Sequence, residues 1–490
     1  MSIVVAGAGT AGWLAALYTQ KTFPYSHITV VYDDKTPIIG VGESTTPNFK
    51  RLMNELDIPV ADLVKECEVT IKNSIKFTNW KGDGSFYHHS FFSALDKNIT
   101  RAYFNAKKLG IHLDEVDPVA SLANSNKVQC IRNDVNVSDD IYDNCGDAYH
   151  FNAKLMAEYL HKIGVKRGIK VVTGKIEDVV QNNDGYVTEI VLDTKQVIKT
   201  DFIFDCTGFA RLFAGKIFKS PIKSYEKELP TKRAMPFFLE KVGSTPSYTE
   251  AIAMKYGWMW KIPVGKRYGC GYVFDSDLIT DEEAYDEICE VTKQKPHVPR
   301  KLAFKPEYYI NPFNKNTLAL GLSHGFLEPL EATSLLIVHY MLHALKKTIP
   351  NLDLTDISRR EDYTKDYNAH VLKWVENCVD FVHIHYLTPR NDTEFWRKFK
   401  TITPERVSRK LLEFDNFDIN NPNSLVDEKP FTLNNMVQCI GGVDCIKNET
   451  IELNSTPYAE DSIKTIRERV KQICELSKNH DDYLNDLTNT

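Results

Sequence analysis

Apolar residues near the start of the chain form two short runs with a helical stretch between them. Residues 3–6 are an apolar run that leads straight into glycines, and residues 28–32 are a second run rich in β-branched residues. Residues 12–23 contain few helix breakers and are predicted to form a helix. A strand, a helix and a second strand therefore follow one another at about the length that one half of a dinucleotide-binding fold requires.

Strand patterns recur in the middle of the chain. Residues 176–180 and 186–192 flank the sequence Asn182-Asn183-Asp184-Gly185, whose residue types favour a tight turn, so these segments predict a β-hairpin. Residues 200–205 predict a further strand, and residues 317–322 predict another that enters a glycine-containing turn. These strands supply the sheet part of a mixed α/β fold.

The last third of the chain has a helical and polar pattern. Residues 332–347 predict a helix that stops near Pro350, and the chain beyond it is mainly helical and polar, with a loop at residues 420–423. Neither an internal repeat nor a low-complexity linker occurs in the sequence. We therefore expect interleaved domains and not a string of separate ones.

The bulk composition excludes several classes of protein. The 490 residues are 42% hydrophobic and 26% charged, as in an ordinary soluble globular protein. The net charge of -6 argues against a general nucleic-acid binder, and no apolar run reaches the length of a membrane span. The N-terminus lacks a basic region and a cleavage site, and the ten cysteines show no CxxC pair or zinc-type spacing. We expect a cytoplasmic protein with reduced thiols, no metal site, no nucleic-acid partner and no membrane association.

The turn between the first strand and the first helix reads Gly7-Ala8-Gly9-Thr10-Ala11-Gly12, which matches GxGxxG. In such a loop the first glycine permits a tight turn, the second lets a pyrophosphate approach the backbone, and the third lets the helix pack closely on the strand. The helix N-terminus adds N–H donors. The motif alone is weak, but its position between a strand and a helix favours a dinucleotide-binding loop over a chance glycine-rich turn. We expect the backbone of Gly7, Gly9, Thr10, Ala11 and Gly12 to bind the cofactor.

The second strand ends at Tyr32, where dinucleotide-binding folds usually place an acidic residue that bonds to a ribose hydroxyl. Tyr32 is expected to pack against the adenosine, and Asp33, the next residue, stays a candidate for the ribose contact. A second glycine loop for a nicotinamide dinucleotide is absent from the sequence, so we expect one dinucleotide only.

Several sequence blocks are more specific than the glycine loop. They are GVGESTTP at 40–47, ECEVTIK at 66–72, IKFTNW at 75–80, DCTGF at 205–209, GWMWKIP at 257–263, FLEPLEAT at 326–333, HYLTPR at 385–390 and FW at 395–396. In register from residue 1 to about residue 400, the chain resembles the flavin-dependent halogenases, of which the tryptophan halogenases are the best known. The WxWxIP match at 257–263, together with the blocks that contain Lys72 and Glu331, is specific to that family. The last ninety residues match poorly.

The resemblance implies a mixed α/β (α+β) fold, with a Rossmann-type FAD-binding domain of the flavin monooxygenase and halogenase type and an interleaved, mainly helical substrate module. We place the FAD-binding core at residues 1–350 and the substrate module at residues 351–490. The implied reaction uses FAD in its reduced form FADH2, molecular oxygen and a halide ion, and makes hypohalous acid that halogenates an electron-rich indole- or phenol-like ring. A separate flavin reductase would supply the FADH2. Whether the chain forms a homo-oligomer stays open.

The resemblance also implies binding roles for individual residues of this chain. Contacts to the flavin are implied for Gly40, Val41, Gly42 and Glu43 in the strap loop, for Leu322 and Leu335 beside the isoalloxazine, and for Ile176. Backbone N–H groups at Thr333 and Ser334 are implied to hold the halide, and an anion near the start of a helix is physically favourable.

Lys72 and Glu331 match the catalytic pair of that family. Hypohalous acid is expected to reach Lys72, whose amine can hydrogen-bond it or form a haloamine. Either role needs a desolvated lysine, and desolvation also tends to lower the lysine pKa. Glu331 is expected to remove the proton from the ring or to polarise the oxidant. The alternatives are a solvated surface charge for Lys72 and an acid stabilised by the helix dipole for Glu331. The rival residues are Glu328 and Lys76, which would share a face with Lys72 if the segment were a helix.

Four ring-bearing side chains are candidates for the walls of the substrate path. Trp258 and Trp260 lie two apart and would face one side of a strand, where they can wall a tunnel, and the alternative is a core aromatic pair. His89 and Phe91 match the pair that sandwiches the substrate, and the alternative is an aromatic-rich core strand over residues 86–92. The two tryptophans argue against an aromatic hydroxylase, which would place its substrate beside the flavin. The intact catalytic pair argues against an inactive FAD-binding protein.

Two departures from the tryptophan halogenases bear on specificity. Residues 434–439 read NNMVQC, without the tyrosine pair expected of a chain that grips free tryptophan, so smaller or varied indoles and phenols are the expected substrates. The usual Glu-Ser-Thr-Gly reads Glu331-Ala332-Thr333-Ser334 here, so Ser334 adds a side chain and restricts the backbone where the family has glycine. A shift from chloride toward bromide and iodide is one interpretation, and an unchanged use of chloride in a slightly shifted site is the other.

Overall fold

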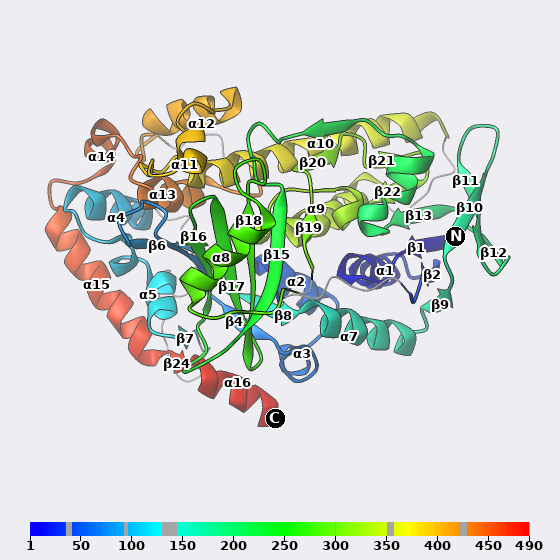
Figure 1. Ribbon diagram of the computed structural model, residues 1–490, viewed down its shortest axis with the longest axis horizontal. Coiled ribbons are helices and arrows are strands. Elements are labelled where there is room, and N and C mark those ends of the chain that lie inside the picture. The colour runs from blue at the N-terminus through cyan, green and yellow to red at the C-terminus, as the bar shows by residue number, and fades with distance from the viewer. Residues whose placement is uncertain are drawn as a thin grey trace.

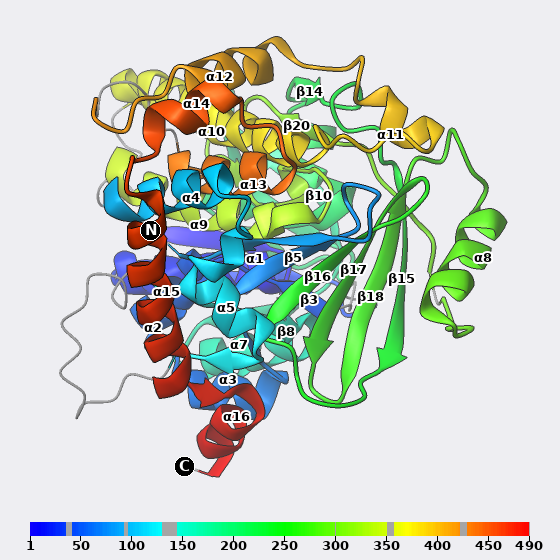
Figure 2. The same cartoon turned by 90° about the vertical axis from the view of Figure 1, so that its left-hand side faces the viewer.

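The computed structural model describes residues 1–35, 42–92, 97–129, 145–298, 300–349, 357–421 and 429–489 (Figures 1 and 2). Gly40 and Val41 of the expected flavin strap, and residues 422–423 of the expected loop, lie outside these ranges. Within the ranges, no helix combines the length and the apolar character that crossing a membrane requires.

The N-terminal β-α-β pattern forms the centre of a six-stranded sheet, at the right of Figure 1. In sheet order its strands are β21 (Phe313–Asn314), β22 (Thr317–Ala319), β13 (Phe202–Asp205), β1 (Ser2–Ala6), β2 (His27–Tyr32) and β9 (Lys170–Thr173). All neighbours pair in parallel except β21 and β22, which are antiparallel. Helix α1 (Thr10–Thr22) packs on this sheet and contacts α7 (Ala153–Lys166) and α9 (Thr333–Thr348). The predicted Rossmann-type unit is confirmed.

Element boundaries differ from the prediction by one to three residues, and two of these differences have a clear local cause. The first helix begins at Thr10 and not at residue 12, because the glycine turn ends at Gly9, the residue that caps the helix. The strand predicted over residues 317–322 stops at Ala319, because Gly321 has φ +60° and begins a short 3-10 turn, η4 (Gly321–Ser323). Extended backbone cannot continue through that turn.

A seven-stranded sheet lies in the middle of the molecule (Figure 1). In sheet order its strands are β19 (Leu302–Ala303), β15 (Arg233–Glu240), β18 (Arg267–Phe274), β17 (Gly257–Val264), β16 (Tyr248–Ala253), β5 (Ser74–Thr78) and β6 (Phe86–Ser90). The neighbours are antiparallel except β16 and β5, which are parallel. Helix α8 (Asp281–Thr292) packs against β18 on the outer side, as Figure 2 shows. The WxWxIP block thus lies on a central strand, β17.

Four smaller sheets complete the β-structure of the described residues. They are β10 (Ile176–Gln181), β11 (Val187–Leu192) and β12 (Val197–Lys199); β14 (Ile222–Ser224), β20 (Glu307–Tyr309) and β23 (Gly325–Phe326); β3 (Gly42–Ser44), β8 (Ala148–Asn152) and β4 (Thr70–Lys72); and β7 (Lys127–Val128) with β24 (Lys478–Asn479). The antiparallel pair of β10 and β11 confirms the predicted hairpin. Strand β8 pairs with both β3 and β4, so the strap strand and the strand that ends at Lys72 lie on the two sides of β8 in one sheet.

Helices cover the sheets, and the chain after residue 357 is mainly helical, as predicted. The remaining helices are α2 (Pro47–Glu55), α3 (Val60–Cys67), α4 (Lys97–Lys108), α5 (Pro118–Asn124), α10 (Ile357–His385), α11 (Glu394–Lys398), α12 (Glu405–Asp415), α13 (Leu433–Gly442), α14 (Asn448–Asn454), α15 (Ala459–Leu476) and α16 (His480–Asn489). Helix α13 packs against β6, and α15 lies along α4 and α5 at the left of Figure 1. The buried His480 accepts a hydrogen bond at Nε2 from the backbone N–H of Ile71 on β4, 409 residues away, at 2.9 Å.

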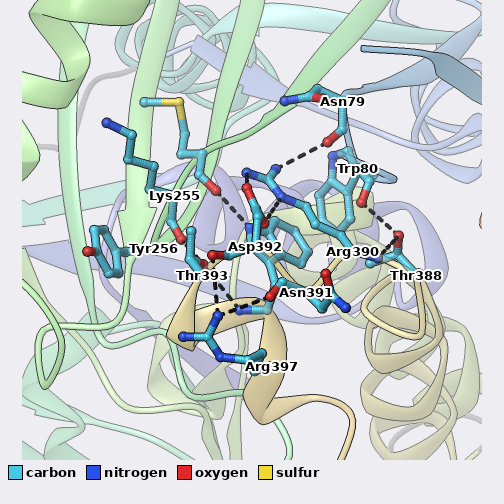
Figure 3. Close-up of polar contacts among 12 residues, drawn as sticks. Asn79, Trp80, Lys255, Tyr256, Thr388, Arg390, Asn391, Asp392, Thr393 and Arg397 are labelled. Atoms are coloured by element: carbon cyan, nitrogen blue, oxygen red, sulfur yellow. Dashed lines mark hydrogen bonds and ion pairs between the residues drawn. The ribbon is translucent and has the colours of Figure 1, made fainter. Parts of the chain in front are cut away.

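The loop between α10 and α11 fixes the C-terminal end of α10 against the seven-stranded sheet (Figure 3). Arg390 donates to the backbone carbonyl of Asn79 at 3.2 Å and to the carboxylate of Asp392 at 2.7 and 3.0 Å. Thr388 Oγ1 donates to the carbonyl of Trp80 at 2.7 Å. The end of α10, which includes His385, is therefore held in a defined position beside β5 and β6.

Candidate active site

A buried carboxylate, Glu331, lies between two imidazole rings. Its Oε2 is 2.7 Å from Nδ1 of His89 on β6, and its Oε1 is 3.0 Å from Nε2 of His385 at the end of α10. All three side chains are at most 2% exposed. Burial alone would raise the pKa of Glu331, but the two rings, which present N–H groups to the carboxylate, outweigh it and hold this pKa below the usual range. Glu331 is therefore an ionised group in a nearly dry surrounding.

The backbone around Glu331 has an unusual conformation. Glu331 has φ +66° and Ala332, the residue before α9, has φ +53°, and both values lie in the left-handed region. Such a conformation costs a residue with a side chain about 1 kcal/mol or more. The turn aims the carboxylate at the two rings, so the side chain of Glu331 joins the cluster and is not an ordinary first-turn acid of the helix.

Asn435 on α13 fixes the tautomer of His89. Asn435 Oδ1 accepts from the backbone N–H and the hydroxyl of Thr432, at 2.8 and 3.0 Å, in a capping box. Its Nδ2 group must then face His89, where it lies 2.8 Å from Nε2. Because Nδ2 can only donate, His89 Nε2 accepts, and the ring proton sits on Nδ1 and is donated to Glu331.

The second ring, His385, is fixed in a similar way by Tyr87. Burial raises the pKa of the Tyr87 phenol well above its usual value, so its hydroxyl stays protonated and can donate to His385 Nδ1, 2.8 Å away. Burial lowers the pKa of His385, although Glu331 acts in the opposite direction. A neutral ring that accepts at Nδ1 has its proton on Nε2, the atom that faces Glu331.

Replacing Asn435 by aspartate should change the protonation of His89. A carboxylate accepts and cannot donate, so His89 must then have a proton on Nε2. In ¹⁵N spectra of histidine-labelled protein, with the His89 signal assigned from a His89→Gln sample, Nε2 should be unprotonated in the wild type and protonated in Asn435→Asp. Asn434→Asp is the matched control, because Asn434 Nδ2 faces the carbonyl of Phe92 at 2.5 Å and not His89. If the His89 signal is the same in Asn435→Asp and wild type, the amide does not set the tautomer.

Lys72, the expected catalytic lysine, is fully buried at the end of β4. Its Nζ donates to the backbone carbonyl of Thr45 at 2.9 Å and lies 4.9 Å from the centre of the Phe91 ring. Burial lowers the pKa of Lys72 to about 7, although the Glu331 carboxylate acts in the opposite direction. The structure thus rules out a solvated surface lysine and links Lys72 to the strap loop through Thr45.

The rival lysine, Lys76, points elsewhere. Lys72 and Lys76 lie on two different strands, β4 and β5, so the helix on which they would share a face is not formed. Lys76 Nζ is 3.9 Å from the centre of the Phe86 ring, and Lys76 pairs with His88 across the sheet. Because side chains alternate along a strand, Lys76 lies on the opposite face of the sheet from His89.

His89 and Phe91 are neighbours, but their rings are not parallel. Their centroids are 6.4 Å apart with an interplanar angle of 69°, and His89 also packs edge-on against Phe381. The structure brings Lys72, Phe91, His89 and Glu331 together in this order. This segment is therefore an aromatic-rich strand that also lies beside Lys72 and Glu331.

Trp258 and Trp260 lie on one face of β17, as expected from their spacing. Both are buried, and their ring centroids are 6.3 Å apart. Trp258 Nε1 donates to Oε1 of Glu328 at 3.2 Å, and Glu328 also accepts from the hydroxyls of Tyr386 and Thr231 at 2.6 and 2.7 Å. Burial raises the pKa of Glu328 to about 7, against three hydrogen bonds that lower it. Glu328, the alternative acid, is thus engaged in fixing Trp258.

The glycine loop has the geometry that a bound pyrophosphate needs. Gly7 has φ +120°, and a Cβ on Gly7 would lie 2.1 Å from the carbonyl oxygen of Cys206. A Cβ on Gly12 would lie 2.1 Å from the carbonyl oxygen of Gly7, so this glycine lets α1 pack on the loop. Space is open within 4 Å of a Cβ on Gly9. Among the described residues, no side chain caps the N-terminus of α1 and its first turn has no acidic residue, which leaves N–H groups for an anion.

The other expected cofactor residues lie on several elements. Tyr32 ends β2 with its ring edge-on to His161, and Asp33 follows it; Gly42 and Glu43 lie on β3; Ile176 begins β10; Leu322 lies in η4; and Leu335 is buried in the first turn of α9. A Cβ on Gly321 would lie 3.0 Å from Cβ of Ala11, so η4 sits directly beside the glycine loop. The loop at Leu322 and the loop at Ala11 therefore border the same region.

The expected halide residues, Thr333 and Ser334, are the first two residues of α9. The residue before them, Ala332, has no side-chain oxygen with which to cap the helix. Ser334 has no positive φ, so the helix imposes the same backbone on serine and on glycine. Any effect of Ser334 on the halide must then come from its side chain.

Sequence reasoning did not identify three groups of this cluster. His385 belonged to a matching block without an assigned role, Asn435 was noted only in the 434–439 segment, and Cys439 was not singled out. The thiol of Cys439, a ring nitrogen of His89 and a carboxylate oxygen of Glu331 lie within 4.8 Å of one another. Spacing along the chain contains no signal for these contacts, because His89 and Asn435 are 346 residues apart.

The chain is similar to known proteins over almost its whole length. The family described as tryptophan halogenase matches residues 2–450. Tryptophan 7-halogenase RebH from Lentzea aerocolonigenes is 30% identical over 432 residues, which cover 82% of this chain and 79% of RebH. Among solved structures, Xcc4156, a flavin-dependent halogenase from Xanthomonas campestris, is 27% identical with a TM-score of 0.85, and the match covers 99% of this chain and 98% of Xcc4156. BrvH, a flavin-dependent halogenase from Brevundimonas sp. BAL3, is 25% identical with a TM-score of 0.87, over 99% of both chains.

Proposed function

The chain belongs to the tryptophan halogenase family and is a flavin-dependent halogenase, and we propose that it uses FADH2, molecular oxygen and a halide ion to halogenate an electron-rich ring of the indole or phenol type. The observation that supports this most directly is the buried cluster in which Lys72 and Glu331 are linked through Phe91 and His89. A desolvated lysine and an ionised carboxylate on two sides of aromatic rings suit the delivery of an oxidant and the removal of a proton.

FAD fits the observed glycine loop, and its site lies in the core of residues 1–350. Residues that would hold it are Gly7, Gly9, Thr10, Ala11 and Gly12 at the pyrophosphate, Tyr32 at the adenosine, Gly42 and Glu43 in the strap, Ile176, and Leu322 and Leu335 at the isoalloxazine. When bound and reduced, FAD supplies, with oxygen, the oxidation of halide to hypohalous acid. Residues 351–490 form the substrate module in this proposal, with α13 closing over His89.

The residues of the cluster divide the chemistry between them. Lys72 Nζ meets the oxidant, and the carbonyl of Thr45 orients the amine through its hydrogen bond. The carboxylate of Glu331 takes the proton that the ring loses when the halogen is added, and His89 and His385 hold this carboxylate in place. Trp258 and Trp260 wall the path between flavin and substrate, and the hydrogen bond from Trp258 to Glu328 fixes this wall. The backbone N–H groups of Thr333 and Ser334 hold the halide at the start of α9.

The proposal is tested by the mass of the product under controlled supply of electrons. Purified protein free of any reductase is given oxygen, bromide, an indole or phenol, and FADH2 from a separate flavin reductase or from chemical reduction. Halogenated product should form and should require both halide and reduced FAD. NADH and FAD without the reductase should give none, because the chain has a single dinucleotide loop. A hydroxylated product that forms without halide would instead establish the hydroxylase.

Free tryptophan should be a poorer substrate than simple indoles or phenols. The polar residues of the 434–439 segment are already bonded inside the protein: Asn434 to the carbonyl of Phe92, Asn435 to His89, and Gln438 to the backbone N–H of Ser90. Because these side chains already make bonds inside the protein, the expected kcat/KM for tryptophan is about tenfold lower or more, the worth of one hydrogen bond to a charged group. A substrate panel measured by product mass checks this. Preferred conversion of tryptophan at a single ring position would contradict it.

The halide preference should be shifted from chloride toward bromide and iodide. Chloride is the most strongly hydrated of the three halides, and the hydroxymethyl group of Ser334 alters the surface that must replace its water. In a competition between equimolar chloride, bromide and iodide, the products should be mainly brominated or iodinated, and Ser334→Gly should raise the chlorinated share. Mainly chlorinated product from the wild type would favour the other interpretation, an unchanged chloride site.

A further inference from the structure

A buried thiol lies inside the catalytic cluster. Cys439 on α13 is fully buried, and its Sγ lies within 4.8 Å of a Glu331 carboxylate oxygen and of a His89 ring nitrogen. In addition, Glu331 Oε1 and His385 Nε2 are buried and, among the described residues, make no hydrogen bond of good geometry. Glu331 Oε1, whose 3.0 Å contact with His385 Nε2 is poorly aligned, therefore lies in the same small space as the sulfur.

We propose that Cys439 is the site at which this enzyme oxidises itself during turnover, when hypohalous acid reaches the cluster and no substrate ring consumes it. The inference rests on the proposed function, since hypohalous acid is the oxidant. It gives the thiol a role as the internal competitor of the aromatic substrate. Both are electron-rich groups beside the carboxylate that accepts a proton.

The chemistry balances without any other reagent. The thiol sulfur attacks the halogen of hypohalous acid, an S–X bond forms, the O–X bond breaks, and the thiol proton and the hydroxide leave together as water. The Glu331 carboxylate, which lies within 4.8 Å of the sulfur, can accept the thiol proton as the S–X bond forms. Water then replaces the halogen, which gives a sulfenic acid and hydrogen halide. The sulfur is oxidised by two electrons and the halogen is reduced to halide, and a second equivalent gives the sulfinic acid, which is not readily reversed.

The position of Cys439 protects it from oxidants in solution but not from one made inside. Burial and the Glu331 charge raise the pKa of Cys439 well above its usual value, so the thiol stays protonated. Peroxide and alkylating reagents attack thiolates that they can reach, so they should spare this residue. Hypohalous acid delivered past Lys72 arrives inside the protein, so the burial of Cys439 does not keep it away from the thiol.

The first experiment maps oxidation by peptide mass after turnover. Wild type is run with a flavin reductase, bromide and limiting indole, and again with saturating indole. We expect one or two added oxygen atoms on Cys439 at limiting indole, less at saturating indole, and none when bromide is omitted and only peroxide accumulates. Cys270 is the internal control, because it is also fully buried and burial raises its pKa to about 12, but it lies on β18 in a separate core. Oxidation of Cys439 without bromide, or equal oxidation of Cys270, would overturn the proposal.

The second experiment counts turnovers. Total product formed before activity is lost, relative to the initial rate, should rise several-fold in Cys439→Ser and stay at the wild-type level in the matched variant Cys270→Ser. If Cys439 stays reduced while activity is lost, or if Cys439→Ser loses activity as fast as wild type, the proposal is wrong. These failures differ from a failure of the proposed function, in which no brominated indole would form in the first turnovers.

Discussion

Lys72→Ala is expected to abolish halogenation, with turnover reduced by about 10²-fold or more, while FAD binding is retained. Lys72 Nζ is fully buried, bonds to Thr45 and lies over the Phe91 ring. Lys76, the other lysine of this segment, faces the Phe86 ring and so does not replace the lost amine. Single-turnover product formation with prereduced FAD measures the loss, and a flavin titration measures binding.

Lys76→Ala is the matched control for this variant. Lys76 is four residues away and lies over the Phe86 ring, on the face of its sheet opposite His89. Its removal should therefore leave the rate near the wild-type level. A large loss in Lys76→Ala together with a normal rate in Lys72→Ala would mean that the lysine assignment is reversed.

The dependence of the rate on pH separates two roles of Lys72. With a pKa of about 7, lowered by burial, the amine is mainly charged below this value and mainly neutral above it. If an ammonium must hydrogen-bond the oxidant, the rate should fall as the pH rises through about 7. If a neutral amine must form a haloamine, the rate should rise over the same range.

Glu331→Gln is expected to reduce the rate of halogenation by about tenfold or more, because the amide cannot accept the ring proton. The substitution keeps the size of the side chain, so the contacts with His89 and His385 are altered in charge more than in shape. Product formation at saturating substrate is the measurement, and a thermal unfolding curve checks that the variant is folded.

Glu328→Gln is the control for the carboxylate. Glu328 receives hydrogen bonds from Trp258, Tyr386 and Thr231, so its replacement should change the environment of Trp258, visible in tryptophan fluorescence, more than the rate. A normal rate in Glu331→Gln with a strong loss in Glu328→Gln would assign the base to Glu328.

Local patterns predicted the parts of the fold that depend on neighbouring residues. The β1-α1-β2 unit, the β10–β11 hairpin and α9 each follow from periodicity and turn residues within a short stretch. The segment around Lys72 shows where prediction from local patterns fails. The spacing of Lys72 and Lys76 fits a helix, but the β-branched residues before Lys72 pair with β8, and Asn73 separates β4 from β5. Whether such a short stretch pairs depends on a partner strand that the local sequence does not contain.

The sequence allowed single residues of the candidate site to be predicted, but not the contacts between them. Lys72 and Glu331 were placed by the register of their blocks, and the structure brings them to one buried cluster, while their roles remain predictions. The environment that tunes them was not predictable, because His89 meets Glu331 across 242 residues and Asn435 across 346. These contacts arise when β6, α10 and α13 pack together, and the packing is a property of the whole fold.

The hydrogen bond from Ile71 to His480 limits how far the protein can fold while it is being synthesised. Ile71 directly precedes Lys72, and its N–H finds its acceptor 409 residues later, on α16. A growing chain that has not yet reached residue 480 would leave this donor unpaired in the interior, beside Lys72. Contacts over such separations form late and slowly. During synthesis the backbone donor next to Lys72 therefore stays without its partner until residue 480 has emerged.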